Sequence, residues 1–183
     1  MQQKNQLRKK YFKLRKKKYY NIDKEYFFPL LKLIKLKLKK KLIKIALYYP
    51  SNFELNVLKI LEFNYILDQD VLLPVTYNNN LMNFFSWKKN DILFINKFGF
   101  LEPAESVIKV PDVMLVPILA YDNKKYRLGY GKGFYDRYLN KYLKKFKNIL
   151  TVGVAFSFQR HHKLPINQND VKLDFVLTEK GIF

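Results

Sequence analysis

The sequence contains no cysteine among its 183 residues, which excludes a disulfide-bonded scaffold, a thiolate metal site and a cysteine nucleophile. It also lacks long apolar runs, and the stretch at 112–117, Asp-Val-Met-Leu-Val-Pro, is far too short to span a bilayer. The basic N-terminal stretch is not followed by the apolar segment and small-residue cleavage site of a secretory signal. We therefore expect a soluble cytoplasmic protein with no membrane association.

Acidic residues are few, because 15 Asp and Glu stand against 35 Lys and Arg, a formal net charge of +20. Residues 1–44 carry 17 Lys and Arg against Asp23 and Glu25, a net of +15 out of that +20. Such a segment could attract nucleic acid, an anionic membrane or a polyphosphate. However, only five of the cations are arginines, and Lys, Asn, Ile, Phe and Tyr are abundant throughout, as in an AT-rich coding sequence. The charge alone does not select a function.

Apolar residues make up 49% of the chain and aromatic residues 17%, enough for the core of one domain. Apolar periodicity predicts helices over 4–20, 24–43, 53–65 and 134–147. Apolar runs predict strands at 45–49, 71–75, 81–87, 113–116, 152–156 and 175–177. Strands alternating with helices indicate an α/β sandwich with a largely parallel sheet. We expect the lysine-rich helices of residues 1–44 to pack on that sheet, with a membrane-surface helix over 24–43 as the alternative.

Glycine is scarce, and three of the six glycines lie within five residues, at Gly129, Gly131 and Gly133. They follow a predicted strand and precede the last predicted helix, the place where α/β sheets bind ligands. Backbone amides of glycines can approach an anion closely, and a helix N-terminus adds a favourable dipole. Arg127 and Lys132 would supply full charges. The spacing fits neither a Walker loop nor a dinucleotide fingerprint, so a phosphate cradle and a flexible connection both remain open.

Two carboxylates are candidate metal ligands, one just after these glycines and one at the start of a predicted strand. Asp136 falls in the first turn of the helix predicted from 134, where it either complements the helix dipole or holds Mg²⁺. Asp174 opens the strand predicted at 175–177, either as a turn residue or as a second oxygen ligand. Each structural role is the simpler explanation when the residue is taken alone.

Taken together, these residues resemble a known family. Residues 127–136, Arg-Leu-Gly-Tyr-Gly-Lys-Gly-Phe-Tyr-Asp, look like the signature of the 5-formyltetrahydrofolate cyclo-ligases, also called methenyltetrahydrofolate synthetases. Supporting pieces occur in the family's order along nearly the whole chain: Leu7-Arg8, Glu54, Gly99–Pro103, Asp112–Pro117, Ala120, Asp122, Val154–Phe156, Gln159, Leu164-Pro165, Asp170, Asp174, Thr178 and Glu179. The glycine motif is specific, and the order of the other pieces adds to it.

The resemblance implies that residues 1–183 form a single domain with a three-layer α/β/α fold. It also implies a reaction in which 5-formyltetrahydrofolate is cyclised to 5,10-methenyltetrahydrofolate, with ATP as co-substrate, Mg²⁺ as cofactor, and ADP and phosphate as products. The γ-phosphoryl group would be transferred to the formyl oxygen, and the charged transition state would be stabilised by positioning. The two small molecules are the expected partners, and we expect a monomer.

The resemblance also implies roles for individual residues. Arg127 and Lys132 would be catalytic, and Asp136 and Asp174 would hold the metal. The residues expected to bind ATP are Lys4, Arg8, Arg127, Leu128, Gly129, Tyr130, Gly131, Lys132, Gly133, Phe134 and Tyr135. Those expected to bind folate are Tyr49, Glu54, Tyr130, Gly131, Lys132, Gly133 and Phe134. Of Tyr49 and Glu54, Glu54 is the more specific prediction, because a carboxylate can accept hydrogen bonds from the donor edge of the pterin.

The alternative from another class is a nucleic-acid-binding protein that uses the basic N-terminal helices, with aromatic rings as stacking surfaces. The aromatic residues, however, follow core periodicity and are not interleaved with the lysines as in such proteins. This alternative also leaves the clustering of glycines, cations and Asp136 unexplained. We therefore expect no nucleic-acid partner.

Overall fold

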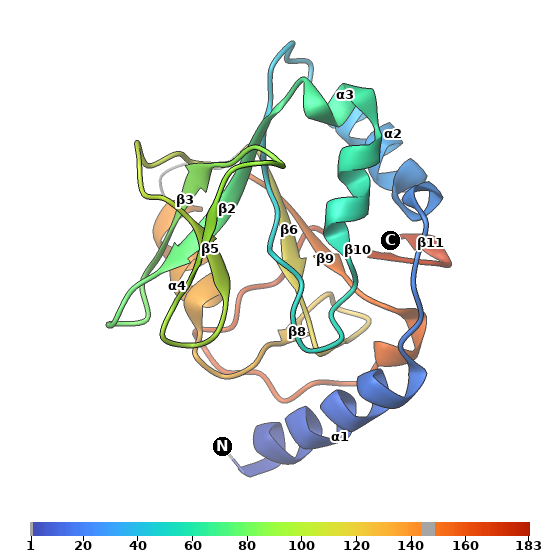
Figure 1. Ribbon diagram of the computed structural model, residues 1–183. Helices are drawn as coiled ribbons and strands as arrows, with labels where there is room; N and C mark the ends of the chain where they lie inside the picture. Colours follow the sequence, from blue (N-terminus) through green and yellow to red (C-terminus); the bar gives the residue numbers. More distant parts are fainter. Residues whose placement is uncertain (1, 144–148) are drawn as a thin grey trace.

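A seven-stranded sheet forms the centre of the protein in the computed structural model, which describes residues 2–143 and 149–183 (Figure 1). Its strands are β1 (Lys44–Ala46), β2 (Asp70–Thr76), β3 (Met82–Ser86), β6 (Val113–Pro117), β9 (Leu150–Val154), β10 (Phe175–Thr178) and β11 (Gly181–Ile182). Their spatial order is β11-β10-β9-β6-β1-β2-β3. The five inner strands run parallel, and β3 and β11 pair antiparallel at the two edges. The expected α/β fold with a largely parallel sheet is confirmed.

Helices cover both faces of the sheet. The helical segments are α1 (Gln2–Lys18), η1 (Lys24–Phe27), α2 (Phe28–Lys37), η2 (Val57–Glu62), α3 (Asn64–Leu67), α4 (Phe134–Tyr142) and η3 (Ser157–Gln159), where η marks a 3₁₀ helix. One core joins the sheet to α2, η2 and α3 and includes the fully buried Leu30, Ile34 and Ile60. A second core joins the opposite face to α4 through Tyr138 and Leu139. Figure 1 shows these two helical layers on either side of the strands.

Several predicted helices are shorter than their apolar pattern suggested. The helix predicted over 24–43 ends at Lys37, because the chain must extend to enter β1, where the Asp112 carboxylate accepts hydrogen bonds from Lys40 Nζ and the Lys44 amide. The segment at 53–65 begins with left-handed backbone and becomes helical only from Val57. The helix predicted over 134–147 is present up to Tyr142, and its last residues fall outside the described part of the chain.

Two short hairpins occupy stretches for which no strand was predicted. The hairpin of β4 (Leu93–Ile95) and β5 (Leu101–Pro103) closes on Glu102, whose carboxylate accepts hydrogen bonds from the Thr76 amide and hydroxyl and from Asn96. The hairpin of β7 (Ala120–Tyr121) and β8 (Arg127–Leu128) follows directly after β6. Both pairings are only two or three residues long, too short for an alternating pattern to be visible in the sequence.

The lysine-rich segment divides between two positions. The second helix, α2, packs on the sheet as predicted. The first helix, α1, lies instead across the end of the molecule beyond the sheet, as Figure 1 shows. Its apolar residues Leu7, Tyr11 and Leu14 pack against Leu128 of β8 and Leu164. No helix in the described ranges is both long and apolar enough to cross a membrane.

Candidate active site

The glycine-rich loop follows β8 at the carboxyl end of β6 and leads into α4. Gly131 and Gly133 have backbone φ angles of +107° and +72°, a conformation that favours glycine. Within the described residues, none of the backbone amides from Gly129 to Gly133 donates a hydrogen bond. Unpartnered amides at a helix N-terminus are the arrangement that binds anions. The loop therefore has the donors that the sequence predicted.

The helix α1 places a cation directly on this loop. Arg8 Nε donates to the Gly129 carbonyl at 2.8 Å, and the Arg8 guanidinium packs on Gly131 so closely that a Cβ there would lie 3.2 Å from its Cζ. Lys4, one turn earlier, forms an ion pair with Asp170. Both predicted residues of α1 thus lie at the loop or beside it, and Arg8 is the one in contact.

Arg127 faces inward and its charge is already balanced. Its side chain is 4% exposed, and Nη2 lies 2.9 Å from Asp136 Oδ1, while Nη1 donates to the Val171 carbonyl at 3.1 Å. The same Asp136 oxygen accepts the Val171 amide at 3.1 Å. This pair fixes the first turn of α4 against the chain at 171. Direct contact of Arg127 with a phosphate would require its guanidinium to leave these partners.

The two predicted metal ligands lie on different elements. Asp136 is in α4, whereas Asp174 precedes β10 and its Oδ2 accepts hydrogen bonds from the Thr151 amide and hydroxyl at 2.8 and 2.7 Å. Thr151 belongs to the start of β9, so Asp174 lies at the amino end of the parallel strands. In the described ranges, no three His, Cys, Asp or Glu side chains gather as a metal site.

Lys132 and a second arginine flank the free amides. The Lys132 ammonium lies 5.4 Å from the centre of the Phe98 ring, and that ring in turn contacts Phe134 edge-on at 5.9 Å. Arg137 was not predicted as a site residue. Its Nη1 donates to the Lys132 carbonyl at 2.6 Å and lies 2.9 Å from where a Cβ of Gly133 would be. Its position one turn into the helix that follows the glycines could have indicated from the sequence that it lies near the loop.

Glu54 lies in a buried polar cluster beside the loop. It is 7% exposed, and its Oε2 accepts hydrogen bonds from the Ser51 amide at 2.9 Å and the Ser51 hydroxyl at 3.3 Å. The Tyr130 hydroxyl lies near the same carboxylate and helps to lower the pKa of Glu54. Burial raises the pKa of Glu54, and the charge of Arg15 and these hydrogen bonds oppose that rise. The structure therefore brings Glu54 and Tyr130, two predicted folate residues, together.

Arg15 was missed by the sequence analysis. It is 1% exposed, and the reason for its burial is visible only in the fold. One signal was available: Arg8 and Arg15 are the only arginines in the lysine-rich segment, and a spacing of seven residues places them on the same face of a helix.

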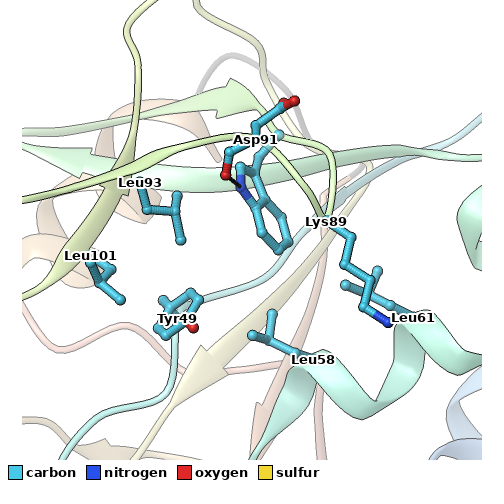
Figure 2. Close-up of a pocket in the computed structure, with 8 residues that line it drawn as sticks. Tyr49, Leu58, Leu61, Lys89, Asp91, Leu93 and Leu101 are labelled. Atoms are coloured by element: carbon cyan, nitrogen blue, oxygen red, sulfur yellow. Dashed lines mark hydrogen bonds between the residues drawn. The ribbon is translucent and has the colours of Figure 1, made fainter.

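Tyr49, the remaining predicted folate residue, lines a separate pocket of about 420 Å³. The wall is mostly apolar, and Figure 2 shows Tyr49 between Leu58 of η2 and Leu101 of β5, with the Lys89 side chain extending along the rim toward Leu61. The hairpin that carries Leu101 also carries Phe98, which contacts Phe134 of α4. The β4–β5 hairpin thus connects this pocket to the loop.

Comparison with known proteins identifies the family. A model of the 5-formyltetrahydrofolate cyclo-ligase family matches residues 1–179. The chain belongs to this family. Among cyclo-ligases, it is 31% identical over 140 residues to the enzyme of Haemophilus influenzae, covering 73% of this chain and 74% of that one. It is 32% identical over 129 residues to a probable cyclo-ligase of Schizosaccharomyces pombe, covering 62% and 63%.

A solved structure agrees with this assignment. The 5,10-methenyltetrahydrofolate synthetase of Aquifex aeolicus superposes with a TM-score of 0.73 and 32% identity, covering 98% of this chain and 91% of that chain. The family and these relatives indicate the cyclo-ligase activity, conversion of 5-formyltetrahydrofolate to 5,10-methenyltetrahydrofolate, and the ligase family implies dependence on ATP. The resemblance inferred from the glycine motif is confirmed.

Proposed function

We propose that the glycine loop binds the triphosphate of ATP and that the cluster around Glu54 binds the pterin of 5-formyltetrahydrofolate. The observation that carries the proposal is the row of unpartnered amides from Gly129 to Gly133, next to a buried carboxylate. Backbone donors and a pterin-binding acid on the two sides of one loop would hold both reactants in reach of each other. Such alignment is the main source of catalysis in phosphoryl transfer.

On the ATP side, Lys132 and Arg8 would add full charges to the backbone donors. Arg137 joins this set, because its guanidinium lies at the N-terminus of α4 and no acidic side chain pairs with it among the described residues. Arg127, predicted as a catalytic cation, would act indirectly, because its ion pair with Asp136 fixes the position of the first turn of α4. Leu128, Phe134 and Tyr135 would shape the loop around the nucleotide.

On the folate side, Glu54 would accept hydrogen bonds from the N–H edge of the pterin. The pocket lined by Tyr49 would take the aromatic remainder of the molecule, since its walls are mostly apolar and its rim carries Lys89. Phe98 and Phe134 lie between the two regions. This placement puts the formyl group of the substrate near the loop that holds the γ-phosphate.

The chemistry follows from the weakness of a formamide as an electrophile. The formyl oxygen attacks the γ-phosphorus of ATP and ADP leaves, which gives an iminium-like phosphate. N10 then attacks the former formyl carbon, the C–O bond breaks, phosphate departs and N10 loses its proton to solvent. The positive side chains and amides of the loop would stabilise the charge that develops on the phosphoryl oxygens.

We propose Mg²⁺ as the cofactor of this reaction. Asp136, in the first turn of α4 directly after the loop, has one carboxylate oxygen with no hydrogen-bond partner in the described residues, so it can contribute a ligand. Asp174 also has such an oxygen but lies at the amino end of the strands, away from the loop. The lack of a three-residue cluster fits Mg²⁺, because this ion takes one or two protein carboxylates and completes its shell with phosphates and water. When bound, the ion would neutralise charge on the phosphates. A shared site of the two carboxylates, a monomeric state and a cytoplasmic location stay predictions.

The deciding experiment mixes the purified protein with 5-formyltetrahydrofolate, Mg²⁺ and ATP and follows the absorbance of the methenyl product together with release of phosphate. We expect equal amounts of the two products. No methenyl product, combined with tight, salt-sensitive binding of nucleic acid, would favour the alternative of a nucleic-acid-binding protein. Omitting Mg²⁺ tests the cofactor, and Asp136→Ala and Asp174→Ala should each raise the Mg²⁺ concentration needed for half-maximal rate.

A further inference from the structure

Arg15 is a buried cation whose position is not explained by stability. Its guanidinium donates from Nη2 to the Asn52 carbonyl at 2.7 Å and to the Tyr130 hydroxyl, and it stacks over the Tyr130 ring with Cζ 5.4 Å from the ring centre. Nη1 reaches the Ile118 carbonyl at 3.4 Å, a weak contact. The buried Nε has no partner within the described chain. Burying a charge with an unsatisfied N–H costs free energy that an apolar residue would not.

The contacts of Arg15 join three parts of the proposed site. Its own helix also carries Arg8, which holds the glycine loop by its Gly129 carbonyl. Tyr130 belongs to that loop, and its hydroxyl accepts a hydrogen bond from Arg15 and lies near Glu54. Asn52 lies in the turn that presents Glu54. Arg15 therefore ties the ATP-side helix both to Tyr130 of the phosphate loop and to the turn at 51–54, whose Ser51 amide donates to Glu54.

Four titratable groups lie close enough to Glu54 to interact with its charge. Arg15 faces it from α1, Tyr130 from the loop, Tyr48 from the segment after β1 and Tyr135 from α4. Burial raises the pKa of each of these three tyrosines well above the ordinary range, so all three stay protonated near neutral pH. The three tyrosines therefore carry no charge there, and Arg15 supplies the cation that opposes protonation of the Glu54 carboxyl.

We propose that Arg15 is a positioning residue that keeps Glu54 ionised and aimed at the pterin, and that couples this carboxylate to the phosphate loop through Tyr130. The proposal rests on the folate-binding role proposed for Glu54. It goes beyond that role by assigning the control of this acid to a residue of the lysine-rich helix. Loss of Arg15 should weaken folate use most where protons compete for the carboxylate.

The experiment measures kcat and KM for 5-formyltetrahydrofolate and for ATP, by phosphate release, across acidic and neutral pH. It compares the wild type with Arg15→Met, Arg15→Lys, Tyr130→Phe and Glu54→Gln. Lys17→Met is the matched control, since Lys17 is exposed on the same helix and its loss removes one positive charge without touching the cluster. Thermal unfolding of each variant separates effects on stability from effects on kinetics.

We expect Arg15→Met to lower kcat/KM for folate about tenfold or more at neutral pH, as for loss of a hydrogen-bonded charge. The acidic limb of its pH profile should move to higher pH, because the carboxyl holds its proton more tightly without the cation. Tyr130→Phe should move the limb the same way but less, and Arg15→Lys should restore part of the shift. Glu54→Gln should abolish the limb, and Lys17→Met should leave it in place.

An acidic limb unchanged in Arg15→Met would overturn the proposal, even if the variant were less stable. If Arg15→Met does not fold, an unchanged limb in both Tyr130→Phe and Arg15→Lys would overturn it equally. Failure of the proposed function is a separate result, because the wild type itself would then form no methenyl product. An active wild type whose Glu54→Gln variant keeps its folate KM would refute the role of Glu54 and the proposal with it.

Discussion

Replacing Gly129 by alanine tests whether the glycine loop is a phosphate cradle or only a flexible connection. Gly129 has a negative φ, unlike Gly131 and Gly133, and a Cβ added to it would meet nothing within 4 Å. The free protein should therefore accept Gly129→Ala without strain. Reduced freedom of the unfolded chain should even stabilise the variant, by about 0.4–1 kcal/mol.

The same substitution should weaken the binding of ATP, although it does not destabilise the protein. If the amide of Gly129 or Tyr130 donates to a phosphate, a methyl group in the open space beside it obstructs the approach of the anion. Loss of one hydrogen bond to a charged group costs about 1.5–3 kcal/mol, which corresponds to a rise of about 10- to 150-fold in the Kd for ATP. Isothermal titration with Mg·ATP measures that Kd, and thermal melting measures stability on the same sample.

Gly131→Ala is the matched comparison. Its φ of +107° strains any L-residue, and its Cβ would lie 3.2 Å from the Arg8 guanidinium. This variant should lose both stability, by about 1–3 kcal/mol, and ATP affinity. The two variants therefore differ in one respect: Gly129→Ala should keep the wild-type melting temperature while its affinity for ATP falls, whereas Gly131→Ala should lose both. Wild-type ATP affinity in a folded Gly129→Ala protein would refute the cradle.

Three further changes separate binding from structure. Lys132→Ala should leave the melting temperature nearly unchanged, since the side chain is exposed and contacts only the Phe98 ring among the described residues. The same variant should reduce kcat/KM for ATP by about tenfold or more. Arg127→Met should lower the free energy of unfolding by about 2–3 kcal/mol, because the Asp136 carboxylate loses its buried partner. Urea denaturation measures this change, and an unchanged denaturation midpoint would show that the Arg127–Asp136 ion pair does not stabilise the fold. Gln159→Leu should cost about 3 kcal/mol, since Gln159 is 1% exposed and makes three buried hydrogen bonds to the backbone, and denaturation of the variant checks this.

The sequence predicted the inner parallel strands well, since β2, β6 and β10 coincide with apolar runs bounded by turn residues. Such strands are covered on both faces, so their side chains are apolar whatever the neighbouring elements are. It overestimated the length of the helix after Asp23, because the apolar pattern continues through 38–43 although the chain there is an irregular loop. Hydrogen bonds to Asp112, distant in sequence, decide that boundary.

The glycine spacing, the cations around it and Glu54 were determined by the sequence alone, because backbone freedom and charge are properties of residue types in order. That pattern was sufficient to identify the family. What the fold decided was the direction in which each charge points. Arg127 turns inward to Asp136, Arg137 lies beside Gly133, and Arg15 is buried under Tyr130. Charged side chains are long and their partners lie far away along the chain, so local sequence does not show whether a cation faces a ligand or a carboxylate.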